Sequence, residues 1–192
     1  MTRIAIIIGS TRQGRLGAQV AGWTHEVAAQ RDDAEFEIVD LAEFHLPLFD
    51  QAVPPSMGGT GGPEAQAWVR AIDGFDGFVF VTAEYNRQLP AALKNAIDFV
   101  YAEWAGKTAA IVSYGGSGGA GAATQLRQLC SLLGMAVVPS QVSMHLATDF
   151  EDYSELVASE RSTAALDKLL DHVVAWTDAL TPLRESEALA GR

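Results

Sequence analysis

Short apolar segments of strand length alternate along the chain with longer segments whose apolar residues recur every three or four positions. The unbroken segment at residues 4–8 is typical of a parallel strand that is buried on both faces. Similar apolar segments, and one short alternating segment, predict four more strands. In chain order, the predicted strands are residues 4–8, 36–39, 78–83, 109–114 and a segment that begins near residues 135–138.

Helical spacing fills the intervals between these strands and follows the last one. Pro63 and Pro90 each precede such a segment, and proline suits the first turn of a helix. The predicted apolar faces are Leu16, Val20, Trp23 and Val27; Ala65, Trp68, Val69 and Ile72; Leu93, Ile97 and Val100; Leu126, Leu129, Cys130 and Leu133; and Leu166, Leu169, Leu170, Val173 and Leu180.

Strands that alternate with helices predict an α/β fold in three layers. Right-handed crossovers and this order of elements predict a flavodoxin-like sandwich around a five-stranded parallel sheet of order 2-1-3-4-5. We expect a single domain over residues 1–183, and a C-terminal tail at 184–192 that lacks a core pattern and frays. The long connection at 41–62 is rich in proline and glycine, and loops of this length are usually functional or mobile.

The composition of the chain excludes several classes of binding partner. A net charge of −11 argues against a nucleic-acid or anionic-membrane surface, and every apolar segment is too short to span a bilayer. The single cysteine, Cys130, lies on an apolar helix face and fits a reducing compartment. Because the first strand follows Arg3 directly, we expect no signal peptide and a cytoplasmic location. The four histidines are scattered at spacings that do not predict a metal site.

The turn after the first strand is the strongest candidate for chemistry. It reads Gly9-Ser10-Thr11-Arg12-Gln13-Gly14-Arg15, and a helix starts at Leu16 and Gly17. Free backbone amides at a helix start favour an anion, and two arginines can fork onto phosphate oxygens. We interpret the turn as a phosphomonoester-binding loop; an ordinary turn with solvated arginines is the alternative. The Gly-x-Gly-x-x-Gly dinucleotide pattern and the Gly-Lys-Ser/Thr nucleotide loop are both absent from this turn.

Two more turns follow the third and fourth predicted strands. They read Glu84-Tyr85-Asn86-Arg87-Gln88 and Gly115-Gly116-Ser117-Gly118-Gly119-Ala120-Gly121. In a sheet of this order, ligands bind beyond the carboxyl ends of the strands at the switch point, where all three turns lie. The plainer alternatives are a tyrosine that caps the sheet edge, an asparagine that forms an Asx turn, and a flexible glycine linker.

The three turns together resemble the NADPH-dependent FMN reductases and their quinone, azo-dye and chromate reductase relatives. Besides the turns, the resemblance includes Pro90-Ala91-Ala92-Leu93-Lys94-Asn95-Ala96-Ile97-Asp98, and it extends from about Ile4 to Val138. It implies bound FMN and homodimers or homotetramers. One departure is Arg87-Gln88-Leu89, where the family has smaller or His-Gly-like residues; this affects the expected substrate pocket more than FMN binding.

Carried over by position, the resemblance assigns cofactor contacts to twelve residues. Those near the FMN phosphate are Ser10, Arg12 and Arg15, with Leu16 and Gly17 at the start of the helix. Those that border the isoalloxazine ring are Glu84, Tyr85, Asn86 and Arg87 on one side and Gly115, Gly116 and Ser117 on the other. We expect Lys94 and Asn95 to have structural or intersubunit roles.

The implied activity is a ping-pong reaction in which NADPH or NADH reduces the flavin, and a small-molecule acceptor then takes the electrons. The acceptor could be a flavin, a quinone, an azo compound or a metal oxyanion. Because the flavin carries the chemistry, no catalytic acid or base is assigned. An electron carrier of the flavodoxin type, without nicotinamide activity, is the alternative. A receiver-like regulatory domain is disfavoured, since Gly9 and Ser10 stand where it needs acidic residues.

Overall fold

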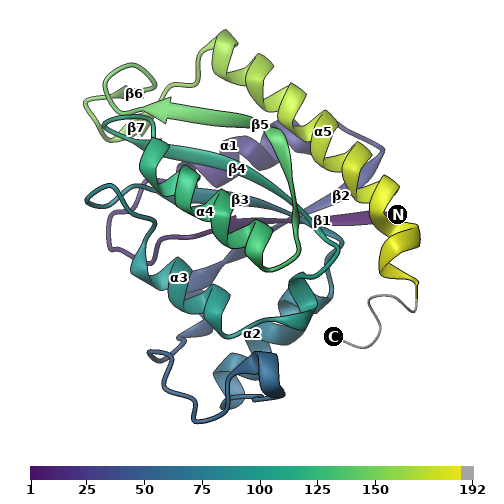
Figure 1. Ribbon diagram of the computed structural model, residues 1–192. Helices are drawn as coiled ribbons and strands as arrows, with labels where there is room; N and C mark the ends of the chain where they lie inside the picture. The colour runs from purple at the N-terminus through teal and green to yellow at the C-terminus, as the bar shows by residue number, and fades with distance from the viewer. Residues whose placement is uncertain (187–192) are drawn as a thin grey trace.

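The computed structural model describes residues 1–186 (Figure 1). Its central sheet has the strand order β2-β1-β3-β4-β5, and every neighbouring pair is parallel. The strands are β1 (Thr2–Ile8), β2 (Ala34–Asp40), β3 (Gly77–Ala83), β4 (Thr108–Gly115) and β5 (Ala136–His145). The predicted sheet and its order are therefore confirmed.

Five α-helices cover the sheet: α1 (Gly17–Ala28), α2 (Pro63–Asp73), α3 (Ala91–Asp98), α4 (Ala120–Leu132) and α5 (Glu160–Arg184). Successive residues of β1 face opposite layers: Ile4, Ile6 and Ile8 pack with α1 and α5, whereas Ala5 and Ile7 pack with α2, α3 and α4. This alternation explains the unbroken apolar run, because both faces of the strand are buried.

The long connection between β2 and α2 is more ordered than its composition suggests. It contains two 3-10 helices, η1 (Leu41–Phe44) and η2 (Pro55–Met57). The Asn95 side chain ties the connection to α3, because its Nδ2 donates to the Pro47 carbonyl at 2.7 Å and its Oδ1 accepts from the Phe49 N–H at 2.8 Å. This gives Asn95 the structural role that we expected.

Several element boundaries differ from the predicted ones. Helix α3 ends at Asp98, so Val100 is buried just beyond it, before a third 3-10 helix, η3 (Ala102–Trp104). A small antiparallel pair, β6 (Phe150–Glu151) and β7 (Glu155–Leu156), was not predicted.

The end of α5 also differs from the prediction. Arg184, where we expected the tail to begin, is the last residue of α5, and its Nη2 lies 3.0 Å from Asp76. Residues 187–192 of the predicted tail lie outside the described residues. Within residues 1–186, no helix combines the length and apolar character that crossing a membrane requires.

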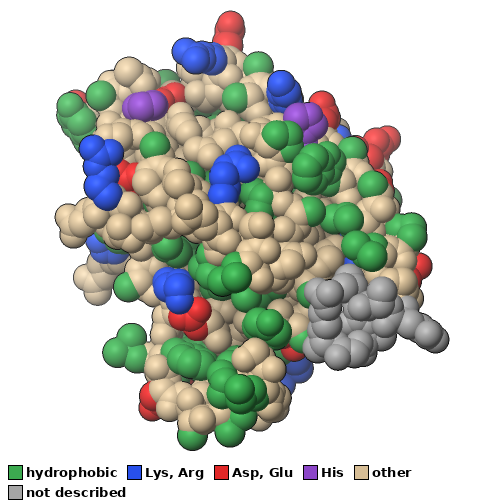
Figure 2. All heavy atoms as spheres, in the orientation of Figure 1, with side chains coloured by type: hydrophobic (Ala, Val, Ile, Leu, Met, Phe, Trp, Pro, Cys, Tyr) green, Lys and Arg blue, Asp and Glu red, His purple; other side chains and the backbone are tan. Residues whose placement is uncertain are grey.

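The surface in Figure 2 carries apolar side chains gathered over its lower part, where Figure 1 shows α2 and the connection before it. The large apolar residues exposed in this region are Leu48, Val53, Met57 and Tyr101. A patch of this kind often marks a contact surface.

Candidate functional site

The three predicted turns meet at the carboxyl edge of the sheet. Backbone hydrogen bonds link the strand ends there: Gly9 N–H donates to the Val81 carbonyl at 2.9 Å, and Glu84 N–H donates to the Tyr114 carbonyl at 3.1 Å. A Cβ on Gly9 would lie 2.8 Å from a methyl of Leu93 and 3.1 Å from the Val81 oxygen. The first turn can therefore leave β1 this tightly only because residue 9 is glycine.

Ser10 and Arg12 form the centre of the first turn. Ser10 is buried, and its Oγ lies 2.7 Å from the hydroxyl of Tyr85. Arg12 is exposed; its Nε donates to the same hydroxyl at 3.3 Å and its Nη2 donates to the Gly14 carbonyl at 3.3 Å. Among residues 1–186, no carboxylate lies within 4 Å of the Arg12 guanidinium. Its charge is free to meet an anion.

Arg15, which we expected at the phosphate, is engaged elsewhere. Its guanidinium forms an ion pair with Asp40 at the end of β2, and the other oxygen of Asp40 accepts from the Ala42 N–H at 3.0 Å. The Nε of Arg15 is buried and has no partner among the described residues. Arg15 thus joins the first turn to β2, and its Nε is a buried donor that remains unused within residues 1–186.

The start of α1 lacks the groups that usually satisfy a helix N-terminus. Leu16 is the N-cap, and the side chains of residues 1–186 form no capping hydrogen bond at this helix start. The buried hydroxyl of Tyr114 reaches this point: a Cβ on Gly17 would lie 2.9 Å from it, and it has no hydrogen-bond partner among the described residues.

Burial raises the pKa of the Tyr114 hydroxyl, and neighbouring Tyr85 raises this pKa further. The nearby Arg12, the backbone of Gly17 and Arg15 oppose the rise with smaller effects. Tyr114 is therefore protonated at neutral pH. An uncapped helix start, a free arginine and orphaned donors fit a phosphate monoester, which carries almost two negative charges at neutral pH. FMN ends in such a group.

The second turn is tight and strained. Tyr85 and Gln88 exchange two backbone hydrogen bonds of 2.9 and 3.0 Å, so Asn86 and Arg87 form the tip. Both tip residues have positive φ, 53° and 69°, and this conformation is costly for residues other than glycine. Strain of this kind is found most often at ligand sites, and both side chains are exposed at the edge of the sheet.

Glu84 has a structural partner that its position in the motif did not suggest. Its Oε2 accepts from the N–H groups of Gly121 and Ala122 at 2.6 and 3.3 Å, so it caps the N-terminus of α4. A Cβ on Gly121 would lie 2.6 Å from the Arg87 carbonyl oxygen. The second and third turns are therefore in direct contact.

The third turn leaves backbone open on its outer side. Within the described part of the chain, no atom lies within 4 Å of a Cβ built on Gly116, and Gly116 and Ser117 are exposed. Gly118 and Gly119 have φ of 66° and 72°, and the Ser113 hydroxyl donates to the Gly118 carbonyl at 2.6 Å. The turn is a shaped surface against which a flat ring can approach the backbone, rather than a flexible linker.

Sequence reasoning missed two neighbours of this turn. A Cβ on Gly118 would lie 2.8 Å from the Nε2 of His145, so that ring rests against the turn. Gln125 of α4 accepts from the Leu89 N–H at 3.2 Å and also bonds to Gln88. Neither contact has a local signal, because each joins segments that are distant in the sequence.

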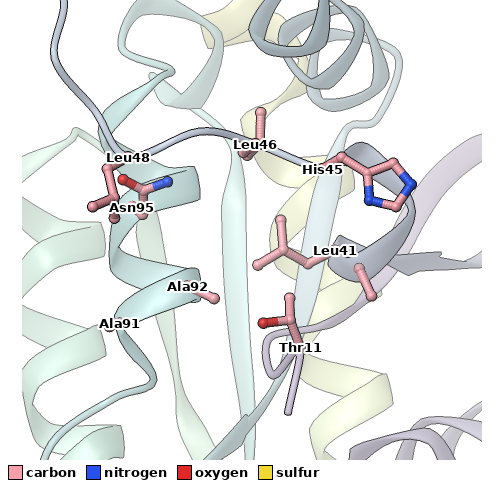
Figure 3. Close-up of a pocket in the computed structure, with 9 residues that line it drawn as sticks. Thr11, Leu41, His45, Leu46, Leu48, Ala91, Ala92 and Asn95 are labelled. Carbon is pink, nitrogen blue, oxygen red and sulfur yellow. The ribbon is translucent and has the colours of Figure 1, made fainter. Parts of the chain in front are cut away.

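A cavity of about 450 Å³ lies beside the first turn (Figure 3). Its walls come from Thr11 of that turn, from η1 and the segment after it, and from the start of α3. The lining residues are Thr11, Leu41, Ala42, His45, Leu46, Leu48, Ala91, Ala92 and Asn95. Six of the nine lining residues are apolar, and Thr11, His45 and Asn95 contribute polar atoms. The long connection therefore shapes a pocket next to the predicted phosphate loop.

Comparison with known proteins identifies the family of the chain. The model of the NADPH-dependent FMN reductase family matches residues 2–149. An NAD(P)H-dependent FMN reductase of Schizosaccharomyces pombe is 41% identical over 149 residues, which are 77% of this chain and 74% of the relative. A 2-hydroxy-1,4-benzoquinone reductase of a Burkholderia species is 33% identical over 185 residues, 91% of this chain and 95% of the relative.

Among solved structures, the flavoenzyme NAD(P)H:(acceptor) oxidoreductase of Paracoccus denitrificans has a TM-score of 0.72 at 22% identity. The likeness covers 93% of this chain and 98% of that one, and it confirms the flavodoxin-like fold. The family match includes all three turns, and it confirms the predicted enzyme class with FMN and a nicotinamide nucleotide as cofactors. The chain belongs to the NADPH-dependent FMN reductase family.

Proposed function

We propose that this protein uses FMN, held at the three turns, to pass electrons from NADPH or NADH to a small-molecule acceptor, with a quinone or a free flavin as the first candidates. The relatives named above as an FMN reductase and a benzoquinone reductase support these two acceptor classes. The observation that carries the proposal is the first turn, where a free arginine, a buried serine and an uncapped helix start converge.

Ser10, Arg12 and the N-terminus of α1 would hold the phosphate of FMN. The backbone of Asn86 and Arg87 on one side, and of Gly115, Gly116 and Ser117 on the other, would border the ring system. FMN supplies the redox chemistry, accepting a hydride equivalent from the nicotinamide and returning the electrons to the acceptor. The chain's own task is to bind, orient and electrostatically stabilise the cofactor.

A ping-pong order of reaction belongs to this proposal, because one open flavin face would serve donor and acceptor in turn. The cavity beside Thr11 is a candidate for the part of the acceptor that extends beyond the ring, since its leucine and alanine walls with a few polar groups suit a small aromatic molecule that carries oxygens. Azo compounds and metal oxyanions are further acceptors to be assayed. We also propose a cytoplasmic location, for which the single buried cysteine is suitable.

Bleaching of the flavin absorbance in stopped-flow mixing tests the function directly. The FMN-loaded protein is mixed without oxygen with NADPH, then separately with NADH, and the reduced protein is mixed with a benzoquinone or with free FMN. We expect fast bleaching and fast recovery of the absorbance. A protein that binds FMN but is bleached only by a chemical reductant would instead be an electron carrier of the flavodoxin type.

We further propose a homodimer or homotetramer, which the exposed apolar residues of the connection before α2 support. The acidic stretch from Asp149 to Glu155, which also contains Phe150 and Tyr153, is a second candidate contact surface, but its first two residues are buried. Asp149 accepts hydrogen bonds from the His145 N–H and from two hydroxyls. Light scattering at micromolar concentration measures the mass, and a monomer would contradict the proposal.

A further inference from the structure

One hydroxyl group joins two turns that are 75 residues apart. The Oη of Tyr85 lies 2.7 Å from the Oγ of Ser10 and 3.3 Å from the Nε of Arg12, and the Ser10 Oγ also accepts from the Arg12 N–H at 3.4 Å. The Arg12 guanidinium carbon lies 6.0 Å from the centre of the Tyr85 ring. Tyr85 thus contacts the first turn with its polar end and with its ring.

The position of this hydroxyl is well determined. The backbone of Tyr85 is held by its two hydrogen bonds with Gln88, and its ring is half-buried against the core on the α1 and α5 side of the sheet. Little conformational freedom remains to be lost when the hydroxyl binds a ligand, which favours a preorganised contact.

The three groups satisfy one another only incompletely. Arg12 is a pure donor, and the Tyr85 oxygen accepts from its Nε. Ser10 and Tyr85 share one hydrogen bond and have two hydroxyl protons between them, so one proton remains for another acceptor. A phosphate monoester offers only acceptor oxygens near neutral pH, and it can therefore take this proton together with the donors of Arg12.

We propose that the hydroxyl of Tyr85 is a ligand of the FMN phosphate, so that the phosphate site includes a residue of the second turn as well as those of the first. The inference rests on the proposed binding of FMN, and it changes the role of Tyr85, which the family resemblance placed at the ring. Phosphate binding then fixes the position of the strained tip at Asn86 and Arg87, because Tyr85 directly precedes it.

The test compares two ligands that differ only in the phosphate, FMN and riboflavin. Their dissociation constants are measured by fluorescence quenching for the wild-type protein and for Tyr85→Phe. A lost hydrogen bond to a charged acceptor should weaken FMN binding about tenfold or more, and riboflavin binding should change less than about twofold. Tyr101→Phe is the matched control, since Tyr101 is exposed and lies at a different cavity.

Each outcome has one meaning. An equal loss of affinity for both flavins would place Tyr85 at the ring and overturn the inference, and so would unchanged FMN affinity. If the wild-type protein binds FMN no better than riboflavin, the proposed phosphate site itself is wrong, which is a separate failure.

A second measurement, fluorine NMR of the wild-type chain, tests the inference even if the Tyr85→Phe variant does not fold. The wild-type chain is labelled with 3-fluorotyrosine at its four tyrosines, and resonances are assigned from the Phe variants of the other three. The Tyr85 fluorine resonance should shift more with FMN than with riboflavin. Equal shifts with the two ligands would contradict the inference.

Discussion

The two ends of the central sheet are built differently. At the amino end, charged groups have close partners: Lys107 donates to the carbonyls of Ile72 and Asp73 at the end of α2, and Arg3 donates to the Gly74 carbonyl and Glu37. At the carboxyl end, the Arg12 guanidinium has no carboxylate partner among the described residues. The Tyr114 hydroxyl is buried there and has no hydrogen-bond partner within residues 1–186.

The contrast has exceptions on both sides: the Thr108 hydroxyl at the amino end is also buried without a partner within residues 1–186, and Arg15 and Glu84 at the carboxyl end have close partners. Backbone strain follows the same division: Asn86 and Arg87, both with positive φ, lie at the carboxyl end. One edge of the sheet is therefore satisfied internally and stabilises the fold. The carboxyl edge keeps hydrogen-bond donors that a ligand can satisfy, together with backbone strain. This combination is typical of a binding site.

Among the variants considered, Arg12→Ala should have the largest effect on FMN affinity. An unchanged affinity would contradict the contrast between the two edges of the sheet. The variant removes a charge-assisted contact to the FMN phosphate, worth about 1.5–3 kcal/mol, so FMN binding should weaken roughly 10–100-fold. The fold should survive, because Arg12 is an exposed loop residue. Titration of the ligand-free protein by fluorescence measures the affinity.

Arg3→Ala is the matched control at the opposite end of β1. It removes the same charge, together with hydrogen bonds to Gly74 and Glu37, so it should lower the melting temperature and leave FMN affinity unchanged. If both variants bind FMN like the wild type, or both lose it equally, the division of roles between the two edges is wrong.

Glu84→Ala tests whether the carboxyl edge also contains a structural part. The carboxylate of Glu84 caps α4 through two N–H groups, and loss of an N-cap costs about 1–2 kcal/mol. Urea unfolding of the ligand-free protein should show this loss. Glu26→Ala, on the exposed side of α1, should be within about 0.5 kcal/mol of wild type. A wild-type stability for Glu84→Ala would mean that the cap contributes nothing.

Much of this architecture could be predicted from the sequence, because periodicity reports burial. The alternation of apolar runs with segments of helical spacing was sufficient to predict the strand order of the sheet. Ser10 and Arg12 also lie close together, as their spacing in the sequence suggests. The partners of Arg15 and Tyr85 could not be predicted. Asp40 is 25 residues from Arg15, and Ser10 is 75 from Tyr85, so only the completed sheet brings each pair together.

The same limit applies to groups whose role depends on one neighbour. Glu84 was predicted at the ring from its place in a motif, and the contact of its carboxylate with α4 could not be predicted from that motif. The β6–β7 pair has only two residues in each strand, too few for a periodic pattern. Backbone strain at Asn86 and Arg87 has no signal in composition, because it results from the turn between Tyr85 and Gln88.

Lys107 gives a pH-dependent test of the satisfied edge. Burial lowers its pKa to about 8, and the nearby carboxylates of Asp73 and Asp76 offset this only in part. An unfolded chain keeps the proton to a pKa near 10.4, so it binds more protons than the folded chain between these values. Stability should therefore rise with pH in this window, by about 1 kcal/mol between pH 8 and 9.

Lys107→Met isolates this contribution, because the other titrating groups are common to both proteins. The difference in unfolding free energy between wild type and variant, measured in urea at pH 7, 8 and 9, should change by only about 0.4 kcal/mol from pH 7 to 8 and by about 1 kcal/mol from pH 8 to 9, in favour of the wild type. A constant difference over the whole range would show that Lys107 titrates normally. In that case the hydrogen bonds from Lys107 to the two carbonyls would compensate fully for the loss of water around its ammonium group.

Tyr114→Phe should have the smallest effect on stability, and it sharpens the comparison most. The Tyr114 hydroxyl is buried, raised in pKa and without a partner among the described residues, so removing it eliminates an unsatisfied polar group and leaves the ring in place. The ligand-free variant should equal the wild type in unfolding free energy or exceed it by up to about 1 kcal/mol. Urea unfolding at pH 7, inside the range where this tyrosine is protonated in both states, measures the difference. A loss of more than about 1 kcal/mol would mean that the hydroxyl is already satisfied in the ligand-free protein, and the carboxyl edge would then lack one of the unused groups that distinguish it from the amino edge.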